Sequence, residues 1–184
     1  MTPWINKAQF DANDASAVDT PGQHAYATTG KGQVKVYRYM QMMDAITYVA
    51  GHSLTFASGD SDGSSGAPSG AVSGKDIPYT TATNDRAGGS NRANHPFAGI
   101  ANALYTQNYY GWLQFRGYAS TIFTDGDVTE GAHMKIKVGS GDDGEVTLEA
   151  TTYATSSLLT FVGHAEAVDS STNVEGMLCG LNFM

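Results

Sequence analysis

An aromatic stretch in the middle of the chain, Tyr109–Tyr118, constrains the fold more than any other segment. It reads Y-Y-G-W-L-Q-F-R-G-Y and contains Trp112, one of the 2 tryptophans of the protein. Leu113 and Phe115 lie on either side of the single polar Gln114, and glycines stand near both ends. Aromatic and β-favouring residues between glycine turn signals are typical of a central strand. We therefore expect a strand here, with the other strands arranged around it.

The composition favours many short strands joined by turns over helices. The 184 residues suffice for one domain, and they include 22 Gly and 10 Tyr but only 15% charged residues. Cys179 is the single cysteine, which excludes an intramolecular disulfide. Its apolar neighbours predict a small buried side chain.

Charge and hydropathy exclude several function classes. The net charge is −8 and no basic run occurs, which argues against binding to a nucleic-acid backbone. The apolar runs are far shorter than a membrane span, so we expect no membrane association. The first residues do not have the pattern of a secretion signal.

Alternating apolar and polar residues predict strands on both sides of the aromatic stretch. Residues 33–40 and 133–138 alternate with a period of two. Residues 97–104 fit a short helix or a strand. The similar segment 161–168 carries His164 and Glu166 between apolar residues, which a helix gains nothing from, so we predict strands for both. The remaining expected strands are 45–49, 52–56, 145–149 and 176–183.

Two segments of the chain repeat each other. Residues 97–104 and 161–168 both read F-x-G-x-A-x-A-apolar, and residues 51–56 correspond in the same way to 131–136. We infer a duplicated β unit whose copies share the aromatic strand. Such a pair predicts an all-β fold, a small barrel or β-roll that is closed or partly closed. The first repeat covers about 33–115, with a Gly/Ser-rich loop insert at 58–94, and the second covers about 112–184.

The N-terminal residues 1–30 differ from the predicted β domain, 31–184. They are mostly polar, with Trp4, Ile5 and Phe10 as isolated large apolar groups. One interpretation is a frayed terminus. The other is an arm that binds a neighbouring protein through these three side chains, because aromatic anchors on an extended segment are a common binding device.

No pattern of catalytic or metal-binding residues stands out. Asp60 and Asp62 alternate with other small residues as in calcium loops, but the twelve-residue frame ending in Glu is absent. The five histidines lack metal-ligand spacing, and no G-x-S-x-G nucleophile elbow occurs. We therefore expect no catalytic residue, no metal and no cofactor, and a hydrogen-bonded or outward-facing side chain at His164.

With these landmarks, residues 33–184 resemble the small β-rich head-decoration, or capsid cement, proteins of tailed bacteriophages. The resemblance is carried by the aromatic strand at 110–117, the hairpin at 131–136 and the strand at 161–167. It implies a structural virion protein, made in the host cytoplasm, that binds the outer surface of an assembled capsid. Its partners would be the major capsid protein and further copies of itself, as a trimer or dimer. The insert at 58–94 and the N-terminal arm depart from the family pattern.

Two other functions remain open from the sequence. In a carbohydrate-binding or adhesion module, Tyr109, Tyr110 and Trp112 would form an aromatic platform for a sugar. This interpretation requires Trp112 to be exposed. In a tail or head-fibre base protein, a similar β module would occupy another place in the virion.

Overall fold

In the computed structural model, every regular element of the described residues is a β-strand. The described residues are 10–29, 32–42, 49–56, 81–83, 97–137, 144–148, 161–170 and 172–180. The strands are β1 (His24–Thr28), β2 (Val34–Met42), β3 (Ser53–Phe56), β4 (Thr81–Thr83), β5 (Phe97–Ala101), β6 (Tyr110–Phe123), β7 (His133–Ile136), β8 (Val146–Leu148), β9 (Phe161–Ser170) and β10 (Asn173–Cys179). The all-β class is therefore confirmed, and 97–101 is a strand as expected. Of the other expected strands, 45–49 lies outside the described residues except for its last residue.

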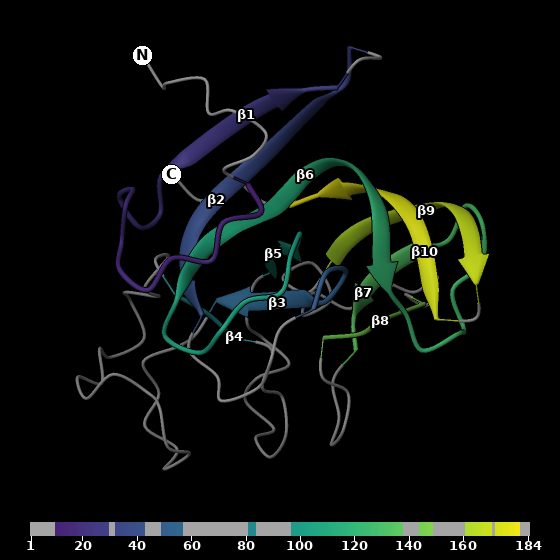
Figure 1. Cartoon of the computed structure of the whole chain (residues 1–184). Helices are drawn as coiled ribbons and strands as arrows, with labels where there is room; N and C mark the ends of the chain where they lie inside the picture. The colour runs from purple at the N-terminus through teal and green to yellow at the C-terminus, as the bar shows by residue number, and fades with distance from the viewer. Residues whose placement is uncertain are drawn as a thin grey trace, which may run out of the picture.

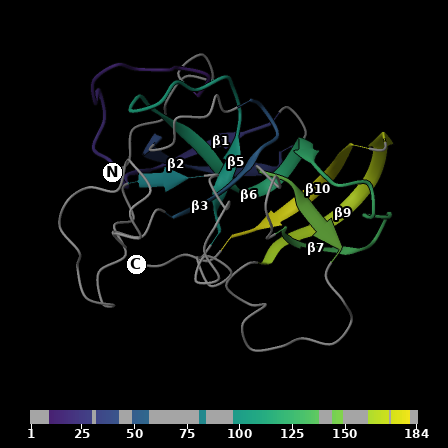
Figure 2. The same cartoon turned by 90° about the horizontal axis from the view of Figure 1, so that it is seen from below.

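The ten strands form one sheet in the order β1-β2-β4-β3-β5-β6-β10-β9-β7-β8. Neighbours are antiparallel except for β2 and β4, which are parallel. Below the long strands, β3 and β5 lie under one part of the sheet and β7 lies under the other (Figures 1 and 2). The predicted insert at 58–94 contributes β4, and its other residues lie outside the described part of the chain.

Strand β6 is central, as the aromatic stretch predicts. It is 14 residues long and arches across the molecule (Figure 1). Its side chains Trp112, Leu113 and Phe115 are buried. Gln114 is buried as well, and its amide nitrogen donates to the backbone carbonyl oxygens of Gly117 at 3.3 Å and Tyr118 at 2.8 Å. These bonds satisfy the polar group that the core would otherwise leave unpaired.

The sequence predicts a small barrel or β-roll that is closed or partly closed, and of these a fully closed barrel is wrong for the sheet as a whole. Its first half does curl, because β2 pairs with β6 in addition to β4. Strand β6 then continues into the second half: Arg116 is opposite both Val36 of β2 and Cys179 of β10. Beyond Arg116 the partner of β6 is β10. The length of β6 therefore carries the sheet onward to β10, β9, β7 and β8.

The two halves place their glycine-containing strands in the same register. In the first half Leu54 of β3 is opposite Gly99, and the register then shifts by one residue. In the second half Met134 of β7 is opposite Gly163, and the register shifts at the same step. A Cβ atom on Gly99 would lie 2.7 Å from the Cβ atom of Leu113, and one on Gly163 would collide with the backbone of Met177. Both glycines therefore allow a neighbouring strand to approach closely.

Three apolar clusters make up the described core. The largest lies mainly in the second half and includes Phe115, Ile122, Met134 and Val162. The second fills the first half around Leu54 and Leu113. The third is aromatic and consists of Phe10, Ala25, Tyr37, Tyr39 and Trp112.

The prediction that Cys179 is buried is wrong. On β10 the inward positions are Val174, Gly176 and Leu178, which alternate along the strand. Cys179 follows Leu178 and therefore points to the opposite face, where its side chain is exposed. The apolar neighbours of Cys179 gave no information about which face it occupies.

Candidate partner-binding site

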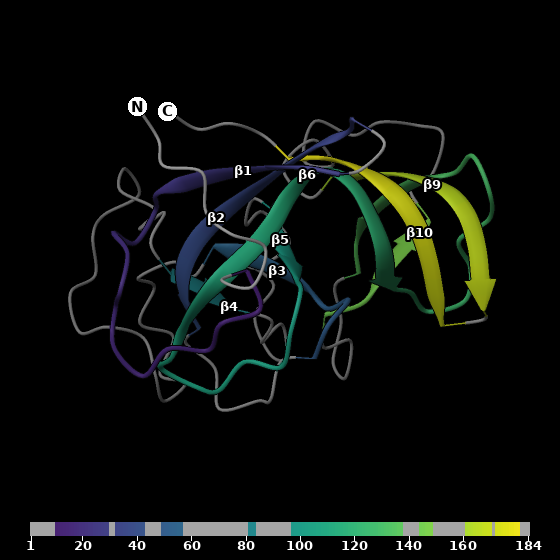
Figure 3. The ribbon, with the colours of Figure 1, turned by 45° about the horizontal axis from the view of Figure 1, so that its top comes forward.

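The structure places part of the expected arm on the sheet. The N-terminal segment, residues 10–23, passes across β6 and turns back into β1, as the purple trace in Figure 3 shows. Asp14 and Tyr110 exchange two backbone hydrogen bonds of 2.9 and 2.8 Å. The Asn13 amide donates to the Thr106 hydroxyl at 3.0 Å, and the Thr106 N–H donates back to the Asn13 side-chain oxygen at 3.2 Å. These bonds hold the segment beside the N-terminal end of β6.

Phe10 fixes the beginning of the N-terminal segment. It is 2% exposed, and its ring stacks on Tyr37 with centroids 3.9 Å apart. The centroid of the Trp112 ring lies 5.8 Å from that of Phe10, and the two ring planes are inclined by 78° in an edge-to-face contact. The Tyr105 hydroxyl donates to the Trp112 carbonyl oxygen at 2.7 Å and lies 3.3 Å from the Phe10 carbonyl oxygen. Phe10 therefore lies in the core of its own chain, which differs from the expectation that it binds a neighbour.

Tyr39 holds the middle of the N-terminal segment. Its hydroxyl donates to the Asp14 carboxylate at 3.1 Å and accepts from the Val18 N–H at 3.2 Å. Burial, with a smaller contribution from Asp14, raises the pKa of Tyr39 to about 12. The hydroxyl therefore stays protonated, and remains a donor to Asp14, throughout the neutral pH range.

Trp4 and Ile5, the other two predicted partner-binding residues, lie outside the described residues. They precede Phe10 by a few positions, so an extended chain would place them within about 20 Å of it. The anchored Phe10 therefore limits where Trp4 and Ile5 can reach.

The aromatic platform required for sugar binding does not form around Trp112. Trp112 is 1% exposed, and its ring is covered by Phe10 and by Tyr39, whose centroid is 5.1 Å away. Tyr110 is half-buried and stacks on Tyr39 at 6.0 Å. A sugar stacks on an exposed aromatic face, so the buried Trp112 ring cannot bind a sugar in this way.

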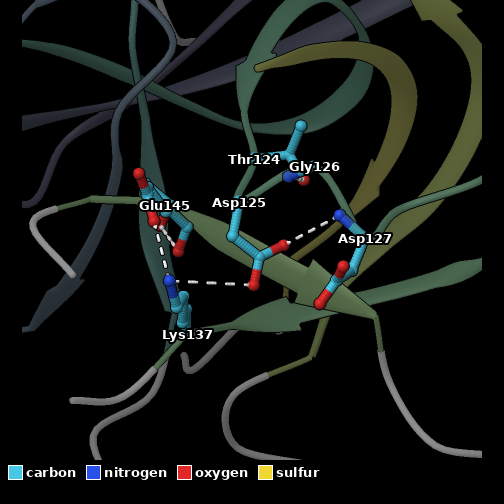
Figure 4. A network of polar contacts seen from close by, with 7 residues as sticks. Thr124, Asp125, Gly126, Asp127, Lys137 and Glu145 are labelled. Atoms are coloured by element: carbon cyan, nitrogen blue, oxygen red, sulfur yellow. Dashed lines mark hydrogen bonds and ion pairs between the residues drawn. The ribbon is translucent and has the colours of Figure 1, made fainter. Parts of the chain in front are cut away.

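The acidic turn after β6 is part of a polar network (Figure 4). The Lys137 ammonium lies 3.1 Å from Glu145 and 3.8 Å from Asp125. The Asp125 carboxylate also accepts the Asp127 backbone N–H at 3.2 Å. Lys137 thus lies between two carboxylates and offsets their charge. The network connects the C-terminal end of β6 to β7 and β8. Ion pairs that are exposed to this degree contribute at most about 1 kcal/mol each to stability.

The structure does not assemble a metal centre from the residues it describes. Within them, no group of three or more His, Cys, Asp or Glu side chains is arranged to hold a metal ion. His164 pairs with Glu166 at 3.1 Å on the outer face of β9, and both side chains are partly exposed. His164 is hydrogen-bonded and outward-facing, as expected.

A buried cationic group on β2 was missed by sequence reasoning. Arg38 is buried, with its guanidinium carbon 4.4 Å from the centroid of the Phe115 ring. Its Nε–H donates to Nε2 of His24 at 3.1 Å. Burial and the nearby Arg38 charge lower the pKa of His24 from its ordinary value. The period of two on β2 places Arg38 on the same face as the buried Val36. This alternation was the sequence feature that could have predicted the burial of Arg38.

Comparisons of the chain with protein-family models, with curated proteins and with solved structures found no match to any of them. Among the described residues there is also no helix that is long and apolar enough to cross a membrane.

Proposed function

We propose that this protein is a structural virion protein that binds the outer surface of an assembled phage capsid and stabilises it. The observation that carries the proposal is the anchoring of the N-terminal segment by Phe10. In this proposal Trp4 and Ile5, which precede Phe10 by a few positions in the sequence, contact a neighbouring capsid subunit. A tethered segment orders fewer residues on binding than a free terminus does, which lowers the entropic cost of the contact.

The two halves of the sheet are, in this proposal, copies of one β unit. Beyond the shared register at Gly99 and Gly163, their turns make corresponding backbone hydrogen bonds. In the first half Gly51 N–H donates to Ala101 O, and Ala101 N–H donates to His52 O, both at 2.9 Å. In the second half the Gly131 N–H donates to Ala165 O at 2.9 Å, and the Ala165 N–H donates to Ala132 O at 2.8 Å. Two similar units sharing β6 supply a broad surface for contact with a lattice.

The partner in this proposal is the major capsid protein, at the exterior of the virion, after synthesis in the host cytoplasm. The protein acts as a homo-oligomer and without catalysis. A ligand that binds only the assembled lattice stabilises it by RT ln(1 + [L]/Kd), about 4 kcal/mol per site at a thousandfold excess over Kd. The stabilisation therefore comes from binding alone, and needs no chemical step.

The test is co-sedimentation of the purified protein with expanded capsids and with unassembled capsid subunits. We expect saturable binding to capsids alone. The double variant Trp4→Ala, Ile5→Ala should weaken binding at least about tenfold, the effect of losing one modest hot spot. Val18→Ala is the matched control, because Val18 is exposed in the N-terminal segment and contacts the sheet only through its backbone N–H in the bonds described above.

Two results would contradict the proposal. Binding to purified tails but not to capsids would place the protein at a tail or head-fibre base. Sedimentation with neither, together with recognition of a glycan on an array, would favour the adhesion alternative.

A further inference from the structure

Strand β1 forms one end of the sheet, and no described strand pairs with its outer backbone edge. Among the described strands it pairs with β2 only, in an unbroken antiparallel register. The flanking hydrogen bonds define which backbone groups face β2. Gln23 O accepts from Tyr39 N–H at 2.9 Å, and Thr29 N–H donates to Gln33 O at 2.8 Å. Odd-numbered residues of β1 therefore direct their N–H and C=O groups toward β2.

The remaining residues of β1 direct their backbone groups away from the sheet. These are His24, Tyr26 and Thr28, which alternate with the inward-bonded positions. They present three N–H donors and three C=O acceptors in a row, which is the template for another strand. The side chains of the same three residues share one face, because their partners on β2 are Arg38, Val36 and Val34.

The β1 edge also lacks the features that keep strands from pairing with other chains. Its sequence, H-A-Y-A-T, contains no lysine, no carboxylate and no proline, and the register with β2 has no bulge. The opposite end of the sheet differs in both respects. Strand β8 is flanked in sequence by Glu145 and Glu149, and its Val146 bridges to Thr124.

A second copy of the same strand fits this edge. If two β1 strands run antiparallel with Tyr26 opposite its own counterpart, His24 is opposite Thr28 of the other copy. Every outward N–H then meets an outward C=O, giving about six hydrogen bonds. Contacts about a twofold axis must be self-complementary, and this spacing meets that requirement. No charged side chain of β1 lies at the seam, although the chain carries a net charge of −8.

Side-chain exposure at the edge agrees with this arrangement. Tyr26 is 42% exposed, at the position through which the twofold axis would pass. Its phenol ring would meet the same ring of the second copy, and cross-strand aromatic pairs of this kind stabilise sheets. Val34, on the next strand and the same face, is 52% exposed but lies farther from the seam.

We propose that β1 is a homodimerisation edge: two copies of the chain pair through β1 about a twofold axis at Tyr26, and their sheets become continuous. This deepens the homo-oligomer part of the proposed function. It concerns the protein free in solution, so its test requires no capsid.

The first experiment is disulfide trapping in the full chain. Cys179→Ser removes the exposed native thiol, and Tyr26→Cys then places a single thiol at the axis. Directly opposed residues in a hydrogen-bonded pair have Cα atoms about 5.5 Å apart, within the disulfide range. Mild oxidation should give one cross-linked dimer at low protein concentration. Val34→Cys in the same background is the matched control and should stay uncross-linked.

The second experiment measures mass by light scattering during gel filtration. Wild-type protein should elute as a dimer. Tyr26→Lys and Tyr26→Glu place like charges opposite each other and should each be monomeric. Mixing the two variants should restore a dimer, because Lys then meets Glu. Val34→Lys, the control, should remain dimeric, and circular dichroism should show the same strand content in all variants.

The outcomes separate this proposal from capsid binding. A monomeric wild type, a dimer unaffected by Tyr26→Lys, or cross-linking equal at residues 26 and 34 would overturn the β1 edge. A dimer that fails to sediment with capsids would support the edge and contradict the capsid proposal.

Discussion

Phe10 stacks on Tyr37 with ring centroids 3.9 Å apart and planes inclined by 22°, so a residue of the N-terminal segment completes the packing of β2. The same ring covers Trp112 of β6. The aromatic cluster is therefore built from three separate parts of the sequence, and the N-terminal segment is a structural part of the domain. The stability of this cluster therefore depends in part on the Phe10 side chain.

Replacing Phe10 should release the N-terminal segment. Phe10→Ala removes a buried ring, at a cost of about 3 kcal/mol. In the Trp4→Phe background Trp112 is the single tryptophan, so its fluorescence reports on this site. We expect a red shift and stronger quenching by acrylamide, with about hundredfold faster hydrogen exchange at Asp14 and Tyr110.

Val18→Ala, at an exposed position of the same segment, should change none of these readings. Unchanged quenching of Trp112 in Phe10→Ala would show that Phe10 does not cover the indole.

The hydroxyl of Tyr39 should contribute measurably to stability. Tyr39→Phe keeps the ring against Trp112 but leaves the Val18 N–H and the Asp14 carboxylate without this partner. Losing hydrogen bonds at a part-buried site costs about 1–2 kcal/mol. Urea unfolding should show a lower midpoint with an unchanged slope. Tyr26→Phe, at an exposed tyrosine for which no described bond involves the hydroxyl, is the control and should unfold as wild type. Equal midpoints for Tyr39→Phe and Tyr26→Phe would contradict the assigned role.

Strand positions followed from local sequence because their signals are local. The aromatic run predicted β6, and the matched pattern around Gly99 and Gly163 identified β5 and β9 as strands. The period of two also predicted inward positions at Met134 and Ile136, which are buried.

Long-range placement did not follow from local sequence. Nothing near Phe10 specifies that its ring meets Tyr37 and Trp112, because that contact joins distant segments. The expectation of a closed barrel failed for the same reason. Strand signals in the sequence do not show where the partner of β6 changes from β2 to β10. Cys179 shows a smaller version of the problem, since a shift of one position on a strand exchanges the buried and exposed faces.

Two glycines with similar positive φ angles should respond differently to substitution. Gly131 has φ +77°, and a Cβ atom there would have no neighbour within 4 Å. Gly117 has φ +87°, and a Cβ atom there would collide with the Val34 carbonyl oxygen. Gly131→Ala should therefore cost only the left-handed backbone strain, about 1–2 kcal/mol. Gly117→Ala should cost at least about twice as much, because β2 must also move away from β6.

Urea unfolding of the two variants checks the comparison directly. Equal losses of stability in the two variants would mean that β2 can move away from Gly117 at Val34 without cost. The close approach of β2 to β6 would then not constrain the fold.

Acid should destabilise the protein through His24. Burial and the neighbouring Arg38 charge hold the pKa of His24 in the folded protein below its ordinary value of 6.5. The unfolded chain therefore binds the proton more readily. The contribution of His24 to stability is complete above pH 6.5 and is lost as the pH falls from there toward the folded pKa.

Thermal unfolding between about pH 8 and pH 5 should reveal this contribution. The decrease in Tm on acidification should be smaller in His24→Gln than in wild type, because glutamine cannot take up the proton while its side chain can still accept from Arg38 Nε–H. His133→Gln, at an exposed histidine of β7, should follow the wild-type curve. If His24→Gln and wild type lose stability in parallel, proton uptake at His24 is not coupled to unfolding. The Arg38 charge would then not disfavour protonation of His24 in the folded protein.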